Sequence, residues 1–208
     1  DDMIRALSAR EDLAFIRGPL PPTEASALAS AREQTQRLSD LVERLLMLGT
    51  LDARLPLARA TDVSAVTERV VSRIELHERV DLLLRIEPGL VAALPDDLLE
   101  VVVRDLVTNA LAYTADGSVD VRGRTQGDRV AIVVSDTGIG IAPDELRHVF
   151  DRFYRGPRAA AIAPGTGLGL AIVRRIVEGY GGEIAIRSEV GRGTEVTVLL
   201  PSAPAARP

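Results

Sequence analysis

Cysteine and tryptophan are absent from the 208 residues, and histidine occurs only twice. Without cysteine the chain has no disulfides, thiolate zinc sites or cysteine nucleophiles, and it fits a reducing compartment. Aromatic residues make up only 3% of the sequence. No apolar run approaches the roughly 20 residues of a membrane span, and no signal peptide is evident. With a net charge of −5, the chain has no broad basic surface suited to nucleic acid or an anionic membrane.

Residues 1–53 are expected to form a helical hairpin. Apolar residues recur at helical spacing early in this segment, and the prolines within 19–22 then interrupt the helix. Between residues 29 and 51 the apolar positions form a seam close to a heptad. Two helices bury little surface alone, so we expect a homodimer in which two hairpins form a four-helix bundle. The alternative is a hairpin that folds back onto the following domain.

Residues 54–61 are interpreted as a linker, and residues 62–201 as an α/β domain. Helical spacing predicts helices at 62–74, 95–113 and 168–180, and a short helix that residues 142–145 open. Alternation and turn residues predict strands at 80–86, 118–124, 129–135, 183–188 and 194–200. Asp96 or Asp97 is expected to cap the long helix, and residues 202–208 to be disordered. The fold class is therefore α+β: a helical hairpin, then an α/β sandwich with one mixed sheet covered by helices on one face.

Two glycine-rich hexapeptides occur in order in the C-terminal half. The first is Asp136-Thr137-Gly138-Ile139-Gly140-Ile141. A carboxylate at a strand end can accept a hydrogen bond from an exocyclic amine, and glycines let a flat base approach the backbone. The second is Gly165-Thr166-Gly167-Leu168-Gly169-Leu170, directly before a predicted helix whose first amides would attract phosphate. Taken alone, the first hexapeptide could be a plain turn.

Asn109 lies inside an otherwise apolar predicted helix. A buried amide is costly unless it finds partners, and an amide oxygen that faces a cleft is a suitable ligand for Mg²⁺. Tyr113 follows four residues later on the same face. Its alternative is an ordinary aromatic residue of the core.

Between the glycine hexapeptides, the scarce aromatic residues are concentrated at Phe150, Phe153 and Tyr154. Arg152 and Arg155 accompany them, and residues 158–164 are rich in alanine with little patterning, as a flexible lid would be. The alternative is a plain core helix.

This ordered set resembles the ATP-binding domain of sensor histidine kinases, within the gyrase, chaperone, kinase and mismatch-repair (GHKL, or Bergerat-fold) ATPase superfamily. The resemblance covers residues 61–201. It implies that Asp136 reads the adenine amino group, that Asn109 binds Mg²⁺, and that the second glycine loop closes over the triphosphate. It also implies a lid anchored by a hydrophobic plug. The nucleotide-contacting set would be Asn109, Tyr113, Asp136, Gly138, Gly140, Ile141, Phe153, Tyr154, Arg155, Gly165, Thr166, Gly167, Leu168, Gly169, Leu170 and Thr194.

The same resemblance implies a function in two-component signalling. The chain would bind ATP or ADP with Mg²⁺ and pass the γ-phosphoryl group to a histidine, for relay to a response regulator. Asp105 and Asn109 would be the catalytic pair. The chain begins without methionine, so we expect the cytoplasmic portion of a longer bacterial protein whose membrane anchor would precede Asp1.

The chain departs from the family pattern at the phosphoacceptor. Its only histidines, His77 and His148, fall within the ATP-binding domain, and aligning the hairpin places Asp1 where the histidine should stand. Three alternatives remain open: the histidine precedes Asp1, is replaced by it, or belongs to a separate His-bearing chain. In each case this chain cannot be its own phosphoacceptor.

The Asn109 helix departs as well. Asp105 stands where sensor kinases usually carry Asn and where ATP-hydrolysing branches carry Glu as a general base, and Ala112 replaces a basic residue. Two rivals to the kinase follow: a hydrolase in which Asp105 activates water, and a pseudokinase that senses nucleotide and regulates a true kinase or a response regulator.

Overall fold

In the computed structural model, the described residues are 35, 38–39, 41–51, 57–74 and 79–203. The chain divides into two units, Asp1–Glu43 and Arg44–Pro208. Described residues 35, 38, 39 and 41–51 are helical, as expected for the second hairpin helix. The rest of the predicted hairpin, most of the linker and His77 lie outside the described residues. None of the described helices has the length and apolarity that a membrane span requires.

The second unit contains a five-stranded mixed sheet. Its order is β2-β4-β5-β7-β6, in which β2 and β4 are parallel and the other neighbours antiparallel. A small ribbon of β1 and β3 accompanies it. The elements in chain order are β1 (Ala60–Asp62), α3 (Val63–Val71), β2 (Val80–Ile86), β3 (Val91–Ala93), α4 (Asp96–Ala112), β4 (Gly117–Gln126), β5 (Arg129–Asp136), α5 (Pro157–Ile162), α6 (Gly169–Gly179), β6 (Glu183–Glu189) and β7 (Gly193–Pro201).

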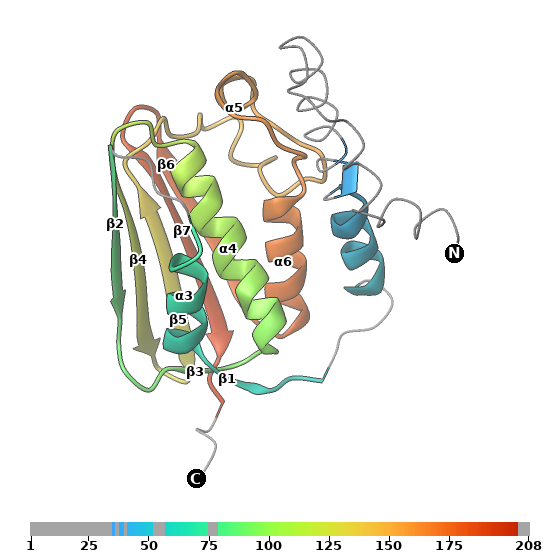
Figure 1. The fold of residues 1–208 in the computed structure, drawn as a ribbon, viewed down its shortest axis with the longest axis vertical. Coiled ribbons are helices and arrows are strands. Elements are labelled where there is room, and N and C mark those ends of the chain that lie inside the picture. Colours follow the sequence, from blue (N-terminus) through green and yellow to red (C-terminus); the bar gives the residue numbers. More distant parts are fainter. Residues whose placement is uncertain (1–34, 36–37, 40, 52–56, 75–78, 204–208) are drawn as a thin grey trace, which may run out of the picture. The chain divides into compact units, whose positions relative to one another are not determined.

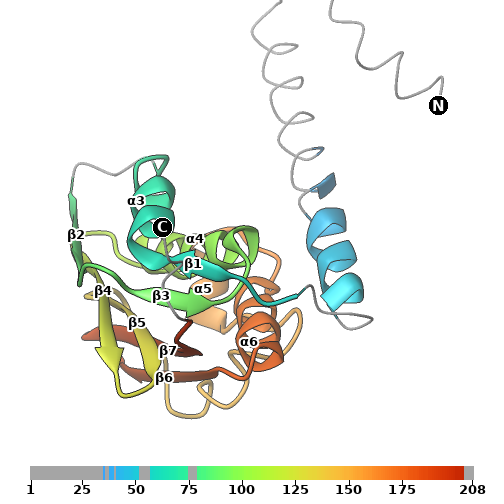
Figure 2. The same ribbon diagram turned by 90° about the horizontal axis from the view of Figure 1, so that it is seen from below.

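Helices α3, α4 and α6 cover one face of the sheet, as the two views of the ribbon show (Figures 1 and 2). Alternate strand residues point towards these helices because successive side chains on a strand face opposite sides. Each fully buried aliphatic side chain contributes about 1.5–3 kcal/mol to stability. The core between sheet and helices includes Val66, Leu99, Val103, Leu106, Val119, Val121, Ile132, Val134, Ile172, Ile176 and Val198. The predicted mixed sheet with helices on one face is confirmed.

The register of β5 and β7 determines which residues share each end of the sheet. Asp136 pairs with Thr194 at one end, and Arg129 pairs with Pro201 at the other. The loops that follow β5 and connect β6 with β7 therefore meet at the Asp136 end. The predicted site residues on these loops are brought together by strand pairing.

Ribbon β1–β3 was not predicted, because strands of three residues are too short to show a pattern in the sequence. β3 also binds the end of the domain: Ala92 bridges to Ser202, and the Ala203 N–H donates to the Val91 carbonyl at 2.9 Å. The prediction of disorder is therefore wrong for Ser202 and Ala203, and residues 204–208 lie outside the described part.

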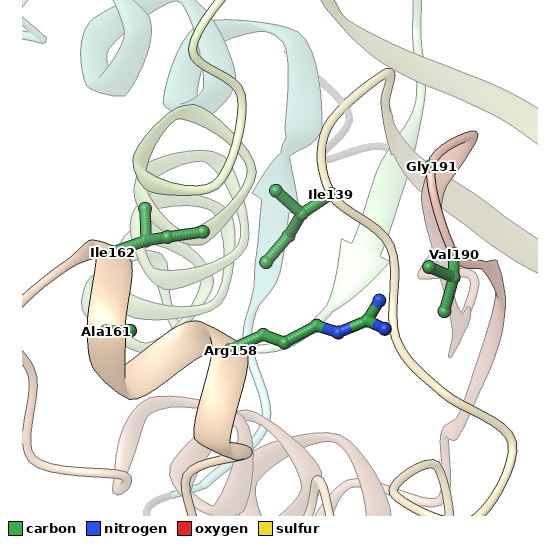
Figure 3. A pocket seen from close by; sticks show the side chains of 6 residues that line it. All are labelled: Ile139, Arg158, Ala161, Ile162, Val190 and Gly191. Carbon is green, nitrogen blue, oxygen red and sulfur yellow. The ribbon is translucent and has the colours of Figure 1, made fainter.

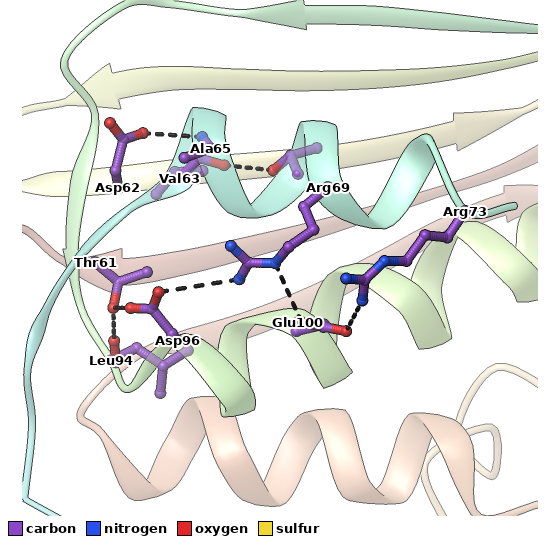
Figure 4. A network of polar contacts seen from close by, with 10 residues as sticks. Thr61, Asp62, Val63, Ala65, Arg69, Arg73, Leu94, Asp96 and Glu100 are labelled. Carbon is purple, nitrogen blue, oxygen red and sulfur yellow. Dashed lines mark hydrogen bonds and ion pairs between the residues drawn. The ribbon is translucent and has the colours of Figure 1, made fainter.

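The predicted cap of α4 is wrong. The cap position is Pro95, and no side chain bonds the first amides of α4 there. Figure 4 shows Asp96 instead accepting a hydrogen bond of 2.6 Å from Thr61, whose hydroxyl also lies 2.5 Å from the Leu94 carbonyl. Glu100 lies 3.4 Å from the guanidinium of Arg69 and links α3 to α4 (Figure 4).

The short helix predicted from residue 142 is also wrong, since residues 143–150 form successive turns. The first turn closes, since the Ala142 carbonyl accepts the Leu146 N–H at 3.2 Å and the Glu145 carboxylate accepts the Ala142 N–H at 3.2 Å. The bonds that follow, from His148 N–H to the Glu145 carbonyl and from Asp151 N–H to the His148 carbonyl, span three residues and do not continue an α-helix. The segment expected to lack pattern contains a helix instead, α5, with proline at its first position.

Candidate nucleotide site

Asp136, at the end of β5, is held by two main-chain amides. Its Oδ1 accepts hydrogen bonds from the N–H of Gly138 at 2.9 Å and from the N–H of Thr194 at 3.2 Å. Within the described residues, no hydrogen bond reaches Oδ2. That oxygen is available to a donor from an incoming molecule.

Burial raises the pKa of the Asp136 carboxyl above its ordinary value of 3.8, while the amides of Gly138 and Thr194 act in the opposite direction. The charged form is therefore stabilised only in part by its own surroundings. A ligand that donates a hydrogen bond to Oδ2 would add to this stabilisation.

The first glycine turn lies against two backbone segments. A Cβ on Gly138 would come within 2.2 Å of the Tyr113 carbonyl oxygen, and one on Gly140 within 2.0 Å of the Glu189 carbonyl oxygen. The Ile139 N–H donates to the Tyr113 carbonyl at 3.1 Å. These glycines are required because the turn passes between the end of α4 and the β6–β7 loop, where no side chain fits.

Two hydrogen bonds connect this turn to the β6–β7 hairpin. The Gly191 N–H donates to the Ile139 carbonyl at 2.9 Å, and the Ile141 N–H donates to Ser188 Oγ at 2.8 Å. Ser188 was not among the residues predicted from the sequence. A lone serine in a strand gives no signal, and its role becomes visible only through the pairing of β6 with β7.

Asp105 and Asn109 lie on α4 beside the start of α6. A Cβ on Gly169 would lie 3.4 Å from Asp105 Oδ2 and 3.7 Å from Asn109 Nδ2. Asn109 is half-buried, and no hydrogen bond to its amide is found within the described residues. The predicted catalytic pair and the second glycine loop are thus brought together.

The second glycine loop leads into α6. Leu168 is fully buried, whereas Gly165 is exposed. Among the described residues no side chain caps α6, so its first amides are available to an anion. Gly167 has a φ of 71°, and a Cβ there would lie 2.6 Å from the Phe153 carbonyl carbon. The Phe153 N–H donates to the Gly167 carbonyl at 2.9 Å, which ties the loop to the aromatic segment.

Arg44 forms a bidentate ion pair with Asp105 inside the second unit. The Nη1–Oδ2 and Nη2–Oδ1 distances are 2.7 and 3.0 Å. The Asp105 side chain is only 2% exposed. In this arrangement both carboxylate oxygens of the candidate general base are occupied by a guanidinium. This partner, which lies 61 positions away, could not be predicted from the sequence.

The aromatic segment differs from the expected plug. Phe153 is 58% exposed, with a φ of 64° that non-glycine residues rarely adopt. Phe150 instead makes the inward contact, since the Arg174 guanidinium carbon lies 5.5 Å from its ring centre. Tyr154 contacts the His148 ring at a centroid distance of 5.4 Å. The expected plug is therefore wrong for Phe153.

The Arg155 side chain donates hydrogen bonds to the segment that was predicted to be a lid. Its guanidinium donates to the Ala159 carbonyl at 3.1 Å and to the Ala163 carbonyl. A hollow of about 450 Å³ lies beside α5. Figure 3 shows the side chains that line it. Its walls are apolar apart from one guanidinium, and they are formed by Ile139, Arg158, Ala161, Ile162, Val190 and Gly191. Ile139 belongs to the first glycine turn, so the hollow adjoins the Asp136 site.

Residues 95–204, more than half of the chain, match the family described as histidine kinase-, DNA gyrase B- and HSP90-like ATPases. The chain belongs to this family. The sensor-like histidine kinase SenX3 of Mycobacterium tuberculosis is 37% identical over 176 residues, which cover 81% of this chain and 43% of SenX3. The sensor protein kinase PmrB of Pseudomonas aeruginosa is 35% identical over 193 residues, which cover 89% of this chain and 40% of PmrB. The chain thus spans less than half the length of these two relatives.

Solved structures of histidine kinases also match the fold of this chain. Full-length ShkA in complex with AMPPNP matches with a TM-score of 0.77 at 27% identity, over 91% of this chain and 41% of ShkA. The mycobacterial sensor histidine kinase MprB matches with a TM-score of 0.62 at 28% identity, over 71% of this chain and 99% of the MprB chain. The predicted resemblance to histidine kinase ATP-binding domains is confirmed, and with it the predicted α+β class with a mixed sheet.

Proposed function

We propose that the second unit binds ATP or ADP and is the catalytic portion of a sensor histidine kinase. The observation that supports this most directly is the arrangement at Asp136. Its Oδ1 is held by two amides and its Oδ2 is left for a donor such as the adenine amine. The uncapped start of α6 is the candidate phosphate site, and the ShkA match is with a complex of AMPPNP.

Asn109 fits a role in holding Mg²⁺. Its amide is half-buried beside the start of α6 and has no hydrogen bond within the described residues. No cluster of three or more acidic or histidine side chains suited to a metal is found in the described part. This agrees with a metal held mainly by phosphates and water, with one amide from the protein. When bound, Mg²⁺ would neutralise phosphate charge.

Transfer of the γ-phosphoryl group to a histidine is favoured over hydrolysis by the environment of Asp105. A general base needs a free oxygen within reach of water, whereas both Asp105 oxygens face Arg44 and the side chain is buried. The protein's contribution to transfer would be to position ATP and to stabilise phosphate charge with backbone amides. A pseudokinase that only senses nucleotide remains the second candidate, because Ala112 supplies no cation and the acceptor histidine is missing from residues 1–53.

Incubation with γ-labelled ATP tests the proposal. We expect no phosphohistidine on this chain, and label on a hairpin from a related kinase that contains the acceptor histidine. Release of free phosphate would identify a hydrolase. Bound nucleotide with label on neither chain would identify a pseudokinase. Stable label at His148, whose ring nitrogen lies 2.9 Å from Asp151 on the surface, would contradict the assigned acceptor.

The proposed partners follow from the relatives. We propose a homodimer through the second hairpin helix, a response regulator that receives the phosphoryl group, and a cytoplasmic location within a membrane-anchored protein. Exposed apolar residues on the described part of that helix support the dimer: Leu38, Val42, Leu45 and Leu46 are 42–65% exposed.

A further inference from the structure

Ser188 lies at the centre of a hydrogen-bond cluster next to the Asp136 site. Its hydroxyl oxygen is 2.8 Å from each of three atoms: the Ile141 nitrogen, the Gly193 carbonyl oxygen and Thr194 Oγ1. The residue is half-buried and pairs directly with Thr194 across β6 and β7. One side chain thus contacts the first glycine turn, the β6–β7 loop and the threonine beside Asp136.

The contacts of Ser188 constrain where its proton lies. A serine hydroxyl has one O–H donor and two acceptor lone pairs. The Ile141 amide can only donate, so it takes one lone pair, and the Gly193 carbonyl can only accept, so it takes the proton. The remaining lone pair faces Thr194 Oγ1, which must then be the donor in that contact.

The proton of Thr194 is consequently directed towards Ser188. Towards another molecule, the Thr194 oxygen can therefore act only as a hydrogen-bond acceptor. The Thr194 main-chain N–H donates to Asp136 Oδ1, so the two residues form one unit whose free positions, Asp136 Oδ2 and Thr194 Oγ1, are both acceptors.

We propose that Ser188 is a positioning residue that sets the base specificity of the site, by orienting the Thr194 hydroxyl as an acceptor. The inference rests on the proposed nucleotide function and deepens it. Two acceptors suit a base edge that carries an amine and disfavour one that carries a carbonyl, because facing acceptors leave lone pairs unpaired. Ser188 would act through Thr194 and would not touch the base.

The test compares ADP with IDP by calorimetry; the base of IDP carries a carbonyl in place of the amine and an N1–H in place of the N1 lone pair. The parent protein should prefer ADP. In Ser188→Ala the preference should fall about tenfold, the size expected when one oriented hydrogen bond is lost. Ser188→Thr, which restores the hydroxyl, should recover most of it. Ser202→Ala removes an exposed serine at the opposite end of the sheet and should leave both affinities unchanged.

A merely structural role for Ser188 gives a different pattern. If the hydroxyl only braces the turn, Ser188→Ala weakens ADP and IDP by the same factor and the ratio stays constant, which would overturn the proposal. Thr194→Val provides a second route if Ser188→Ala does not fold, since it keeps the shape and the main-chain amide. It should lower the ratio equally, and adding Ser188→Ala to it should change the ratio no further. Failure of the parent to bind ADP would contradict the nucleotide function itself.

Discussion

The main-chain N–H of Thr194 donates to Oδ1 of Asp136 across 3.2 Å, although 58 positions separate the two residues. They are directly paired at the end of the β5–β7 ladder. The orientation of the carboxylate is therefore fixed by a neighbouring strand as well as by its own turn. The proposed base recognition would therefore depend on the register of β7.

Replacing Asp136 with asparagine should weaken ADP binding about tenfold or more, because the amide offers a donor or a neutral acceptor where the base needs a charged one. Calorimetry measures the effect, and Asp128→Asn, on the β4–β5 turn, serves as the matched control. Unchanged ADP affinity in Asp136→Asn would remove the main support for the proposed site.

The same variant should be more stable than the parent without nucleotide. Burial raises the pKa of Asp136, so the folded state binds the proton more tightly than the unfolded state, and ionisation of the carboxyl reduces stability. This penalty is complete above the raised pKa and disappears as pH falls below 3.8. Thermal unfolding should show a gain for Asp136→Asn at neutral pH that shrinks towards pH 4. In the parent, lowering the pH should weaken ADP binding, and it should do so at a higher pH than that at which an ordinary aspartate is protonated. A gain independent of pH would contradict the stated cause.

Gly138→Ala should abolish nucleotide binding, because its Cβ would lie 2.2 Å from the Tyr113 carbonyl oxygen and push the turn away from α4. Gly49→Ala is the control: nothing lies within 4 Å of a Cβ there, and the residue is exposed on a helix. Retained ADP affinity in Gly138→Ala, measured by calorimetry, would show that the turn can relax without loss of the site.

Arg44→Gln should destabilise the second unit by about 1–3 kcal/mol, because it leaves the buried Asp105 carboxylate without its charged partner. Urea unfolding measures this, and Arg44→Gln combined with Asp105→Asn should recover most of the loss. Strictly additive effects of the two changes would show that the ion pair contributes nothing. The single variant should also be assayed for phosphate release, since Asp105 would then be free to act on water.

Leu41→Glu together with Leu45→Glu should convert the proposed dimer into monomers that still bind ADP. Charged side chains in an apolar helix seam are poorly tolerated, whereas neither residue belongs to the proposed nucleotide site. Light scattering reports the change in mass. A monomeric parent would favour a hairpin that folds back within one chain.

The parts of the fold that depend on local pattern could be predicted from the sequence. Strands β2, β4, β6 and β7 show largely alternating patterns between turn residues, and β5 is a short continuous apolar run. Helix α6 has apolar helical spacing before Gly181. The β1–β3 ribbon could not be predicted, because three-residue strands exist only through their partners. The turns at 143–150 resemble a helix start in sequence, and their first turn closes, but the later bonds from His148 to Glu145 and from Asp151 to His148 span three residues and do not continue a helix.

In the site, the glycines and Asp136 could be predicted because each has a chemical reason that is visible locally. Ser188 and Arg44 could not. Their roles come from contacts with Thr194 and Asp105 that only the folded chain creates. Phe153 was expected in a hydrophobic plug because the resemblance implied one, yet its ring is exposed, its φ is positive and its N–H donates to the Gly167 carbonyl.

The small β1–β3 ribbon has a consequence for how this domain can be used. β3 binds both the strand by which the chain enters the domain and the residues by which it leaves, near Pro201 and Ser202. Asp136 and Thr194 lie at the other end of the β5–β7 pairing. The chain therefore enters and leaves this domain at neighbouring positions, at the end of the β5–β7 ladder opposite the proposed base-binding residues. Segments that precede β1 or follow β7 would not have to pass the proposed site.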